Sequence, residues 1–243
     1  MIAFHPAPAS LPPGQRIYAV GDIHGCAARL ALLHAQIAAD LAARPVAAPT
    51  LLHLGDYVDK GEDSAGVLAY LAGPLLSPLP GRGQPVARVD LGGNHEAAML
   101  AALDGAPGDV ADWLWCGGRA TLDSYGLSPE ATPAEWRAAI PPAHLAWMRG
   151  LTVWYRAGGY LFVHAGIRPG LPLEAQAPED LVRIRQPFLS SEASHGVVVV
   201  HGHTARSEPE IRHNRINLDT AAWSGGPLTC AVLEADRIGF LQA

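Results

Sequence analysis

Short β-rich runs that end in clusters of polar residues recur along the chain. The first run covers residues 16–20 and leads into Gly-Asp-Ile-His-Gly at positions 21–25. A second run, residues 50–54, leads into Gly-Asp-Tyr-Val-Asp-Lys-Gly at 55–61, and a third, residues 86–91, precedes Gly-Asn-His-Glu at 93–96. Short runs of branched and aromatic residues bounded by turn residues are typical of buried strands. The pattern predicts three strands, each followed by a polar loop.

Helices are predicted between and after these strands. Residues 27–43 place Leu30, Leu33, Ile37 and Leu41 at the spacing of a helix that buries one face. Further helices are predicted over residues 63–71 and 96–103, which gives a βαβαβ order and therefore parallel pairing. Loops after the ends of parallel strands meet at one edge of the sheet, where ligands bind. We therefore expect the polar clusters to lie close together.

The second half of the chain adds two more strands with polar ends. Residues 160–163 precede His-Ala-Gly at 164–166, and residues 197–200 precede His-Gly-His-Thr at 201–204. Three later runs, at 215–218, 228–233 and 238–241, are joined by short turns and are predicted to be antiparallel to one another. The predicted fold is α/β, a mixed two-sheet β-sandwich flanked by helices, in a single domain over residues 1–243.

Residues 106–155 differ from the rest in being rich in Trp, Pro and Ala. We interpret them as a mostly helical insertion that caps the sheet edge. Most of its tryptophans are expected to be core residues, and one or two are expected to line a cleft. The tryptophans are Trp113, Trp115, Trp136, Trp147 and Trp154.

Composition excludes several classes of function. The 49% apolar and 16% charged shares are ordinary for a globular enzyme, and the net charge of −6 disfavours nucleic acid and anionic membranes as partners. The longest apolar run, 97–103, is far short of the ~20 residues of a membrane span. The Pro-rich residues 1–14 do not resemble a signal peptide, so a cytoplasmic location is expected. Cys26, Cys116 and Cys230 are expected to be reduced.

The five polar clusters carry the chemistry. Each single cluster is a weak signal, because carboxylates and histidines at loop ends often cap helices. Five strand ends that each deliver Asp, Asn or His beside Gly supply the mixed oxygen and imidazole ligands of divalent cations. Two such ions ~3.5–4 Å apart can hold a phosphoryl group and a water that ionises near neutral pH.

The ordered series of motifs resembles the metallophosphoesterases of the phosphoprotein phosphatase family, and most closely its bacterial and phage-lambda-type branch. The resemblance runs from Gly21 to about Thr220 and implies the calcineurin-like metallophosphoesterase fold. It implies two bound divalent ions, Mn²⁺ foremost, with Fe or Zn as alternatives. The implied ligands are Asp22 and His24 for the first metal, a bridging Asp56, and Asn94, His164 and His203 for the second.

The resemblance also implies roles around the metals. His95 is the implied general acid and Asp59 the carboxylate that orients it; the alternative for His95 is a further metal ligand. Lys60 stands where the family usually has Arg, and a Lys cannot form the planar bidentate pair with phosphate. Arg185 is the implied phosphate clamp, and Arg183, which replaces a usual Trp, is interpreted as a solvated charge.

Some neighbouring positions receive no catalytic role. His201 is interpreted as a supporting or packing residue, and Glu96 and Thr204 as residues that orient ligands. Cys116 stands where relatives carry Asn, which removes a side-chain hydrogen bond from that loop.

Three functions remain open on the sequence. The first is a serine/threonine protein phosphatase of broad specificity, acting on phosphoprotein or small phosphoesters. The alternative is a bis(nucleosyl)-tetraphosphatase, in which Arg183 and the stretch with Trp113 and Trp115 would contact remote phosphates and purines; Asp59, usually Ala in relatives of that kind, favours the phosphatase. The remote alternative is a non-catalytic metal- or phosphopeptide-binding module. The sequence assigns no oligomeric state.

Overall fold

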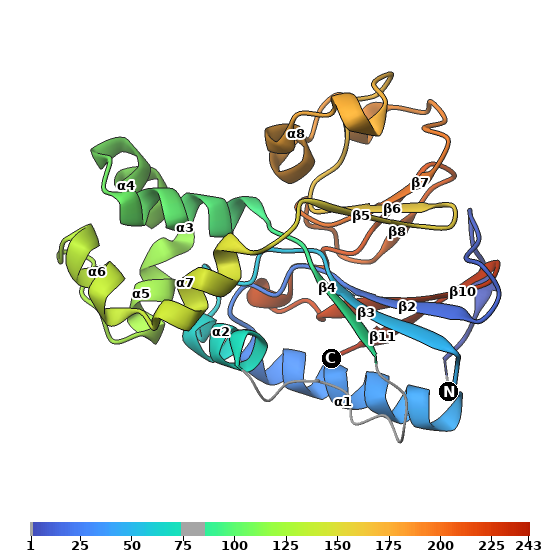
Figure 1. Ribbon diagram of the computed structural model, residues 1–243, viewed down its shortest axis with the longest axis horizontal. Helices are drawn as coiled ribbons and strands as arrows, with labels where there is room; N and C mark the ends of the chain where they lie inside the picture. The colour runs from blue at the N-terminus through green and yellow to red at the C-terminus, as the bar shows by residue number, and fades with distance from the viewer. Residues whose placement is uncertain (1, 74–85) are drawn as a thin grey trace.

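A computed structural model describes residues 2–73 and 86–243, and its strands form two sheets (Figure 1). The first sheet has the order β1-β11-β10-β2-β3-β4. Its strands are β1 (His5–Pro6), β2 (Gln15–Val20), β3 (Ala48–His53), β4 (Ala87–Asp90), β10 (Thr229–Glu234) and β11 (Arg237–Gln242). The second sheet has the order β5-β6-β7-β9-β8. Its strands are β5 (Trp154–Ala157), β6 (Tyr160–Val163), β7 (Val198–His201), β8 (Glu210–Ile211) and β9 (Arg215–Asn217).

Helices flank both sheets and build a separate layer beside their edge. Two helices connect the strands of the first sheet: α1 (Ala27–Ala43) and α2 (Ser64–Ala72). The others are α3 (Asn94–Asp104), α4 (Pro107–Trp113), the π-helical turn η1 (Leu114–Gly118), α5 (Arg119–Ser124), α6 (Pro133–Ala139), α7 (Pro142–Arg149) and α8 (Pro178–Arg183). The described residues also form three 3₁₀ turns: η2 (Leu173–Ala175), η3 (Phe188–Ser190) and η4 (Ala222–Ser224).

The parallel pairing predicted for the first three long strands is confirmed. β2 pairs in parallel with β3, and β3 with β4, so that Val20, His53 and Asp90 lie in register at their carboxyl ends. β6 pairs in parallel with β7, which brings the loops after 163 and 201 to one edge of the second sheet. These paired ends determine where the polar clusters meet.

The predicted pairing of residues 215–218 is wrong. We expected this strand to be antiparallel to the strand at 228–233, whereas β9 lies in the second sheet, parallel to β7 and antiparallel to β8. The connection from 202 to 214 is long enough to return the chain to the start of β7, and it contributes the short β8 on the way. β10 and β11 form the expected antiparallel hairpin.

Three apolar layers hold these elements together. Between the sheets, Ala19, Leu52, Phe162 and Val200 belong to one buried cluster, as a two-sheet sandwich requires. On the other face of the first sheet, the apolar stripe of α1 packs against the strands through Leu30, Leu33 and Ile37. Behind the second sheet, Leu161 and Val199 pack against Phe188 and the region of α8. The predicted fold class is confirmed.

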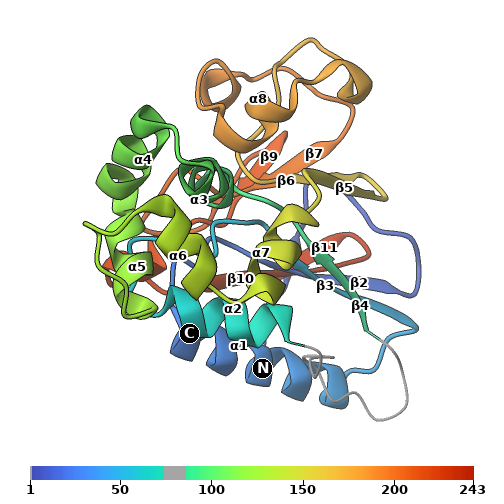
Figure 2. The same cartoon turned by 60° about the vertical axis from the view of Figure 1, so that its left-hand side comes forward.

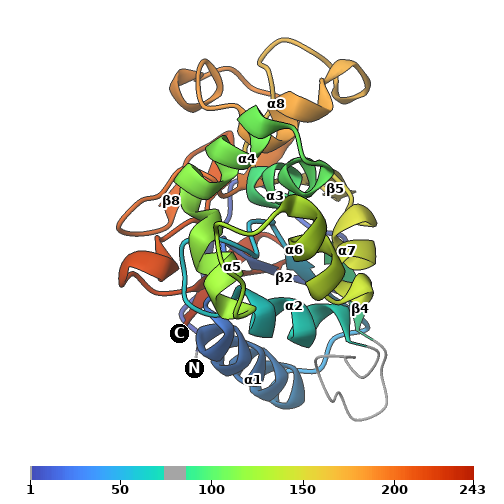
Figure 3. The same ribbon diagram turned by 90° about the vertical axis from the view of Figure 1, so that its left-hand side faces the viewer.

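The segment predicted as a helical insertion forms helices α4 to α7, which lie with α3 beside the sheets (Figures 2 and 3). Pro occupies the first turn of α4, α6 and α7, where its missing N–H costs no hydrogen bond. Trp113 and Trp136 are fully buried core residues, as expected, while Trp115 is 88% exposed.

Two further expectations concern cysteines and membranes. Cys26, Cys116 and Cys230 are free thiols. Among the described residues, the structure contains no helix with the length and apolarity that a bilayer crossing would require.

Candidate metal centre and active site

Backbone strain gathers where the polar loops meet. Seven non-glycine residues of the described chain have a positive φ. Five of them lie in the predicted site: His24, Asp56, Asp59, Lys60 and His203. Residues with side chains rarely adopt this conformation, and when they do they cluster at functional sites. The strained loops turn these side chains toward one another at the strand ends.

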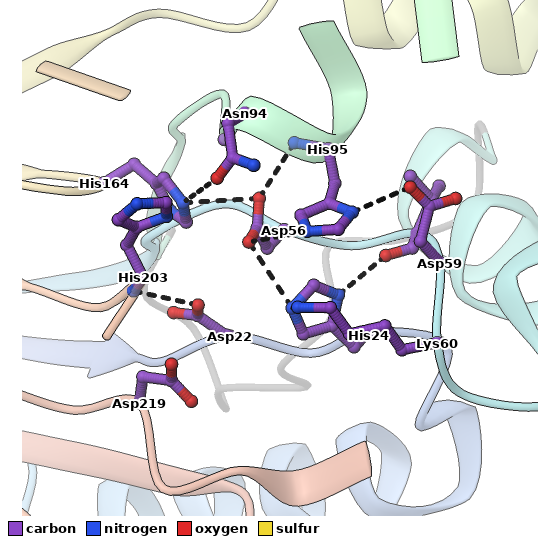
Figure 4. Close-up of polar contacts among 12 residues, drawn as sticks. Asp22, His24, Asp56, Asp59, Lys60, Asn94, His95, His164, His203 and Asp219 are labelled. Atoms are coloured by element: carbon purple, nitrogen blue, oxygen red, sulfur yellow. Dashed lines mark hydrogen bonds and ion pairs between the residues drawn. The ribbon is translucent and has the colours of Figure 1, made fainter. Parts of the chain in front are cut away.

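Asp56 lies at the centre of the site (Figure 4). Its carboxylate belongs to two groups of three side chains, one with His24 and His95 and one with His164 and His203. Within each group the candidate ligand atoms lie within 4.8 Å of one another. A carboxylate shared by two such groups is the geometry that a bridging ligand requires.

The two histidines that face Asp56 point their ring lone pairs at its oxygens. His24 Nδ1 donates to the Val58 carbonyl at 2.8 Å, and His164 Nδ1 donates to the Leu54 carbonyl at 3.0 Å. A carbonyl can only accept, so Nδ1 carries the proton and the lone pair of Nε2 faces the site. His24 Nε2 lies 3.4 Å and His164 Nε2 3.3 Å from Asp56 oxygens. Lone pairs that face one another in this way repel unless a proton, an ammonium group or a metal ion lies between them.

Asp22 and Asn94 both lie beside the second group. The amide oxygen of Asn94 lies 3.1 Å from His164 Nε2. Asp22 Oδ2 accepts the backbone N–H of His203, but Asp22 Oδ1 is buried with no hydrogen-bond partner among residues 2–73 and 86–243. Burial, and then the charge of Asp219, raises the pKa of Asp22 well above its ordinary value. A buried carboxylate oxygen without a hydrogen-bond partner suits a divalent cation.

Two glycines allow the carboxylates this close approach. A Cβ at Gly202 would lie 1.8 Å from Asp22 Oδ1, and a Cβ at Gly93 would lie 2.1 Å from Asp56 Oδ1. Glycine in the motifs Gly-Asn-His-Glu and His-Gly-His-Thr therefore makes room for ligand oxygens. Together with the donor atoms above, this cradle fits a metal site.

Glu96 holds the loop that carries Asp56. Its buried carboxylate accepts four backbone N–H groups, from Asp56, Tyr57, Val58 and Gly93, at 2.7–3.2 Å. The positions of both the Asp56 loop and the Asn94 loop thus depend on one carboxylate. This geometry agrees with the predicted orienting role.

His95 and Asp59 form the predicted pair. His95 Nδ1 lies 2.8 Å from Asp59 Oδ2, and His95 Nε2 faces Asp56 Oδ2 at 3.9 Å. Burial alone lowers the pKa of His95, but the charge of Asp56 and the hydrogen bond to Asp59 outweigh it, so the pKa is raised above its ordinary value. The protonated ring can donate to an oxygen that approaches Nε2.

Asp59 is itself held by residues that the sequence did not single out for this role. Trp113 Nε1 donates to its carboxylate at 3.0 Å, and Thr121 Oγ1 donates at 2.6 Å. Thr121 also accepts the backbone N–H of Asp59 at 2.8 Å. Trp113 is therefore a buried support and cannot stack on a purine, which corrects the role considered for it in a tetraphosphatase.

Lys60 lies beside the group formed by His24, Asp56 and His95, and it lines a cavity. Its Nζ is 2.9 Å from His24 Nε2 and 5.5 Å from the ring centre of Trp223. The backbone N–H of Lys60 donates to the carbonyl of Gly117. The loop with Cys116 thus contacts the site through its backbone, and Cys116 itself is exposed.

Arg183 at the end of α8 and Arg185 just after it occupy different places. Arg185 is exposed, and its charge adds to burial and to His164 in lowering the pKa of His203 to about 3. Its position beside the second group is compatible with the predicted phosphate contact, which stays a prediction. Arg183 lines a separate cavity of about 490 Å³ next to Gly93. His201 is fully buried against Phe188 and packs there, as interpreted from the sequence.

Asp219 is a site residue that the sequence reasoning missed. It is 95% buried and carries one of the charges that raise the pKa of Asp22, which it neighbours in Figure 4. Asp219 follows β9 closely, so the strand-end signal applied to it as well, but no glycine precedes it.

Comparisons with known proteins identify the family to which the chain is related. The sequence profile of the family described as Calcineurin-like phosphoesterase matches residues 15–237. A symmetrical bis(5'-nucleosyl)-tetraphosphatase from Ralstonia nicotianae is 31% identical over 161 residues, which are 66% of this chain and 44% of that protein. Another, from Methylococcus capsulatus, is 32% identical over 153 residues, 63% of this chain and 44% of that protein. The matches thus span less than half the length of these curated relatives.

A solved structure resembles the whole chain. The crystal structure of a protein provisionally named a diadenosine tetraphosphatase superposes with a TM-score of 0.66. The superposition covers 97% of this chain and 98% of that one, at 24% sequence identity. At this identity the match supports the fold alone.

Proposed function

The chain belongs to the calcineurin-like phosphoesterase family, and on this premise we propose that it cleaves dinucleoside polyphosphates symmetrically with the help of two divalent ions. As a member it is a phosphoric ester hydrolase. The observation that carries the proposal is the sharing of Asp56 by two groups of candidate ligands. The substrate class is supported by the curated relatives, which favour the tetraphosphatase alternative over the protein phosphatase first preferred from the sequence.

The proposed ligands are those expected from the resemblance. Asp22 and His24 would hold one ion, Asn94, His164 and His203 the other, and Asp56 both. Divalent ions held there would supply a water that ionises near neutral pH and would offset the charge of the phosphate chain. We propose Mn²⁺ for both positions, because its preference for oxygen ligands together with imidazole matches the donor set.

The residues around the ions have separate tasks. His95 can donate its Nε2 proton to the departing phosphate oxygen, while Asp59 keeps the ring oriented. Lys60 offers a positive charge on the side of His24, and Arg185 one on the side of His203. One water is consumed, a P–O bond in the middle of the chain breaks, and two nucleoside diphosphates leave.

A second candidate, phosphomonoester hydrolysis, is favoured by the Asp59–His95 pair. Protonation of the leaving group matters most for an alkoxide such as that of serine, because a departing phosphate is already a weak base. A pair that is hydrogen-bonded at 2.8 Å and supported by Trp113 and Thr121 is equipped for this harder task.

A turnover panel tests both candidates. The Mn²⁺-loaded protein would be given diadenosine tetraphosphate, a phosphoserine peptide library and an aryl phosphate, with a chelator as the control. We expect kcat/KM for the dinucleotide to exceed that for the peptides by more than about tenfold, or ~1.4 kcal/mol, with ADP as the only nucleotide product. A preference for peptides would establish the second candidate. Metal binding without turnover of any substrate would point to a binding module.

A further inference from the structure

We propose that the cavity between Lys60 and Trp223 binds the nucleoside of one substrate half, with the nucleobase stacked on the Trp223 ring. The cavity has a volume of about 520 Å³, and its lining includes Gly25, Arg29, Lys60, Glu62, Asp63 and Trp223. The inference rests on the proposed function and names the subsite that a dinucleotide would need beyond the metal ligands.

The position of Trp223 is the first reason. Lys60 lies between the candidate metal site and Trp223: its ammonium is 2.9 Å from His24 Nε2 and 5.5 Å from the centre of the Trp223 ring. The Lys60 ammonium therefore stands between the indole of Trp223 and the candidate metal ligand His24. A substrate whose reacting phosphate is held by the ions can extend along Lys60 into this cavity.

The exposure and rigidity of Trp223 are the second reason. Trp223 is 44% exposed, although large aromatic rings usually gain free energy from burial. It stands on the turn η4, which begins after Ala221 with φ 55° and ends at Gly225 with φ 100°. Asp219 Oδ1 accepts the N–H of Ala221 at 3.0 Å, so the same residue borders the metal site and anchors the turn. An exposed aromatic ring on a hydrogen-bonded turn can stack against a nucleobase.

The charges of the cavity indicate which part of the substrate enters it. Two cationic residues, Arg29 and Lys60, are balanced by two acidic ones, Glu62 and Asp63. Arg29 is engaged with the carbonyls of Gly226 and Ala243. A second phosphate group would meet the two carboxylates, whereas ribose hydroxyls can donate to them, as they do to acidic residues in dinucleotide-binding folds. The uncharged nucleoside therefore suits this cavity better than more phosphate.

Calorimetric titration of the Mn²⁺-loaded protein tests the proposal without requiring turnover. ADP and inorganic pyrophosphate carry the same two phosphates, but only ADP has a nucleoside. We expect Trp223→Ala to weaken ADP binding roughly tenfold, within the range measured for base stacking, and to leave pyrophosphate binding unchanged. Trp223→Phe, which keeps an aromatic ring, should retain most of the affinity for ADP.

The control is Trp154→Ala, because Trp154 on β5 is 45% exposed and does not line the cavity. Equal losses for ADP and pyrophosphate in Trp223→Ala, or no loss for ADP, would overturn the subsite, as would wild-type protein that binds ADP no more tightly than pyrophosphate. Failure of the proposed function would appear elsewhere, as wild-type protein that leaves diadenosine tetraphosphate intact.

Discussion

At the scale of single residues, the geometry of the site depends on glycines as well as on the candidate ligands, because a side chain at these glycines would collide with ligand oxygens. Gly202 allows Asp22 to approach the second group of ligands, since a Cβ there would lie 1.8 Å from Asp22 Oδ1. The adjacent His203 donates its N–H to the other oxygen of the same carboxylate. The orientation of Asp22 is thus set by two consecutive residues of the loop after β7.

Gly202→Ala is therefore expected to impair the metal site. The methyl group must displace Asp22, and changes to residues that orient ligands commonly cost 10–100-fold in metal affinity or activity. Metal content and kcat/KM would be measured together. Gly108→Ala is the matched control, because a Cβ at Gly108 meets no atom within 4 Å. Full metal content and activity in Gly202→Ala would show that Asp22 is not a ligand.

His95→Asn separates a proton donor from a metal ligand. If His95 protonates the leaving group, the variant should keep its metals and slow alkyl phosphates by roughly 10²–10⁴-fold. Diadenosine tetraphosphate and aryl phosphates should suffer less, since their leaving groups need little protonation. Asp59→Asn should also slow alkyl phosphates more than the other two substrates, because the Asp59 carboxylate holds His95 Nδ1 at 2.8 Å. Loss of metal from His95→Asn would instead identify His95 as a ligand.

At the scale of elements, α1 is tied to the first sheet by a buried polar chain. Tyr70 Oη lies 3.1 Å from His34 Nδ1, His34 Nε2 lies 3.0 Å from His53 Nε2, and His53 Nδ1 lies 2.8 Å from Asp90 Oδ1. With His53 donating to Asp90, its Nε2 accepts from His34, and His34 Nδ1 accepts from Tyr70. In this arrangement His34 is neutral, and its burial between α1 and the sheet disfavours the charged form.

This chain predicts a loss of stability in mild acid. Burial, and then the charge of His53, lowers the pKa of His34 to about 3, while the unfolded chain takes up the proton near pH 6.5. Between these values the unfolded state binds more protons, so stability falls as pH decreases below 6.5, by at most about 1.4 kcal/mol per pH unit. His34→Gln, which cannot titrate, should reduce this slope.

Urea unfolding in chelator at pH 7.5 and 5.5 would measure the slope. His5→Gln is the control, because His5 is exposed on β1. An unchanged pH dependence in His34→Gln would contradict the neutral assignment of His34.

The elements also show what the sequence pattern could and could not predict. α1 has the predicted bounds, Ala27–Ala43, because its apolar stripe is regular and faces a single sheet. The strands at 16–20 and 160–163 are predictable from the sequence because each is largely apolar and is followed by a polar loop. The partner of β9 could not be predicted, because it depends on the path of the irregular loop at 202–214, which places β9 beside β7.

The same division holds within the site. Residues that follow strands beside glycine were predicted, because strand ends meet at one edge whatever the rest of the chain does. The supports of Asp59 were not, since Trp113 and Thr121 are 54 and 62 residues away in the sequence and carry no local signal. Trp223 likewise acquires its setting only when η4 is brought beside Lys60.

At the scale of the whole molecule, buried negative charge is concentrated at the edge where the strand ends of the two sheets meet. Burial raises the pKa values of Asp22 and Asp219, and the negative charge of Asp56 raises both further. Such repulsion weakens the folded state unless cations offset it. Metal binding and overall stability should therefore be linked.

Mn²⁺ is expected to raise the unfolding temperature relative to protein in chelator. A ligand at a hundredfold its Kd contributes ~2.7 kcal/mol, which for a chain of this size corresponds to roughly 5–10 °C. Asp219→Asn should raise the unfolding temperature of the protein in chelator and so reduce the difference in unfolding temperature that Mn²⁺ causes. Asp112→Asn, at an exposed position, should leave both unfolding temperatures unchanged. Differential scanning calorimetry would show this, and identical unfolding temperatures with and without Mn²⁺ would rule out the linkage.

The order of strands in the first sheet has a consequence for how the protein is made. β2 is complete at Val20, but the strand that covers its other side, β10, begins only at Thr229. At about 5–20 residues per second, a ribosome needs on the order of 10–40 s to supply it. During that time the growing chain carries β2 with one row of backbone groups unpaired, which is the kind of edge that recruits other strands. Chaperone demand should therefore peak before the last hairpin emerges, and a stalled ribosome that has not reached β10 should hold a chain far more prone to aggregation than the finished protein.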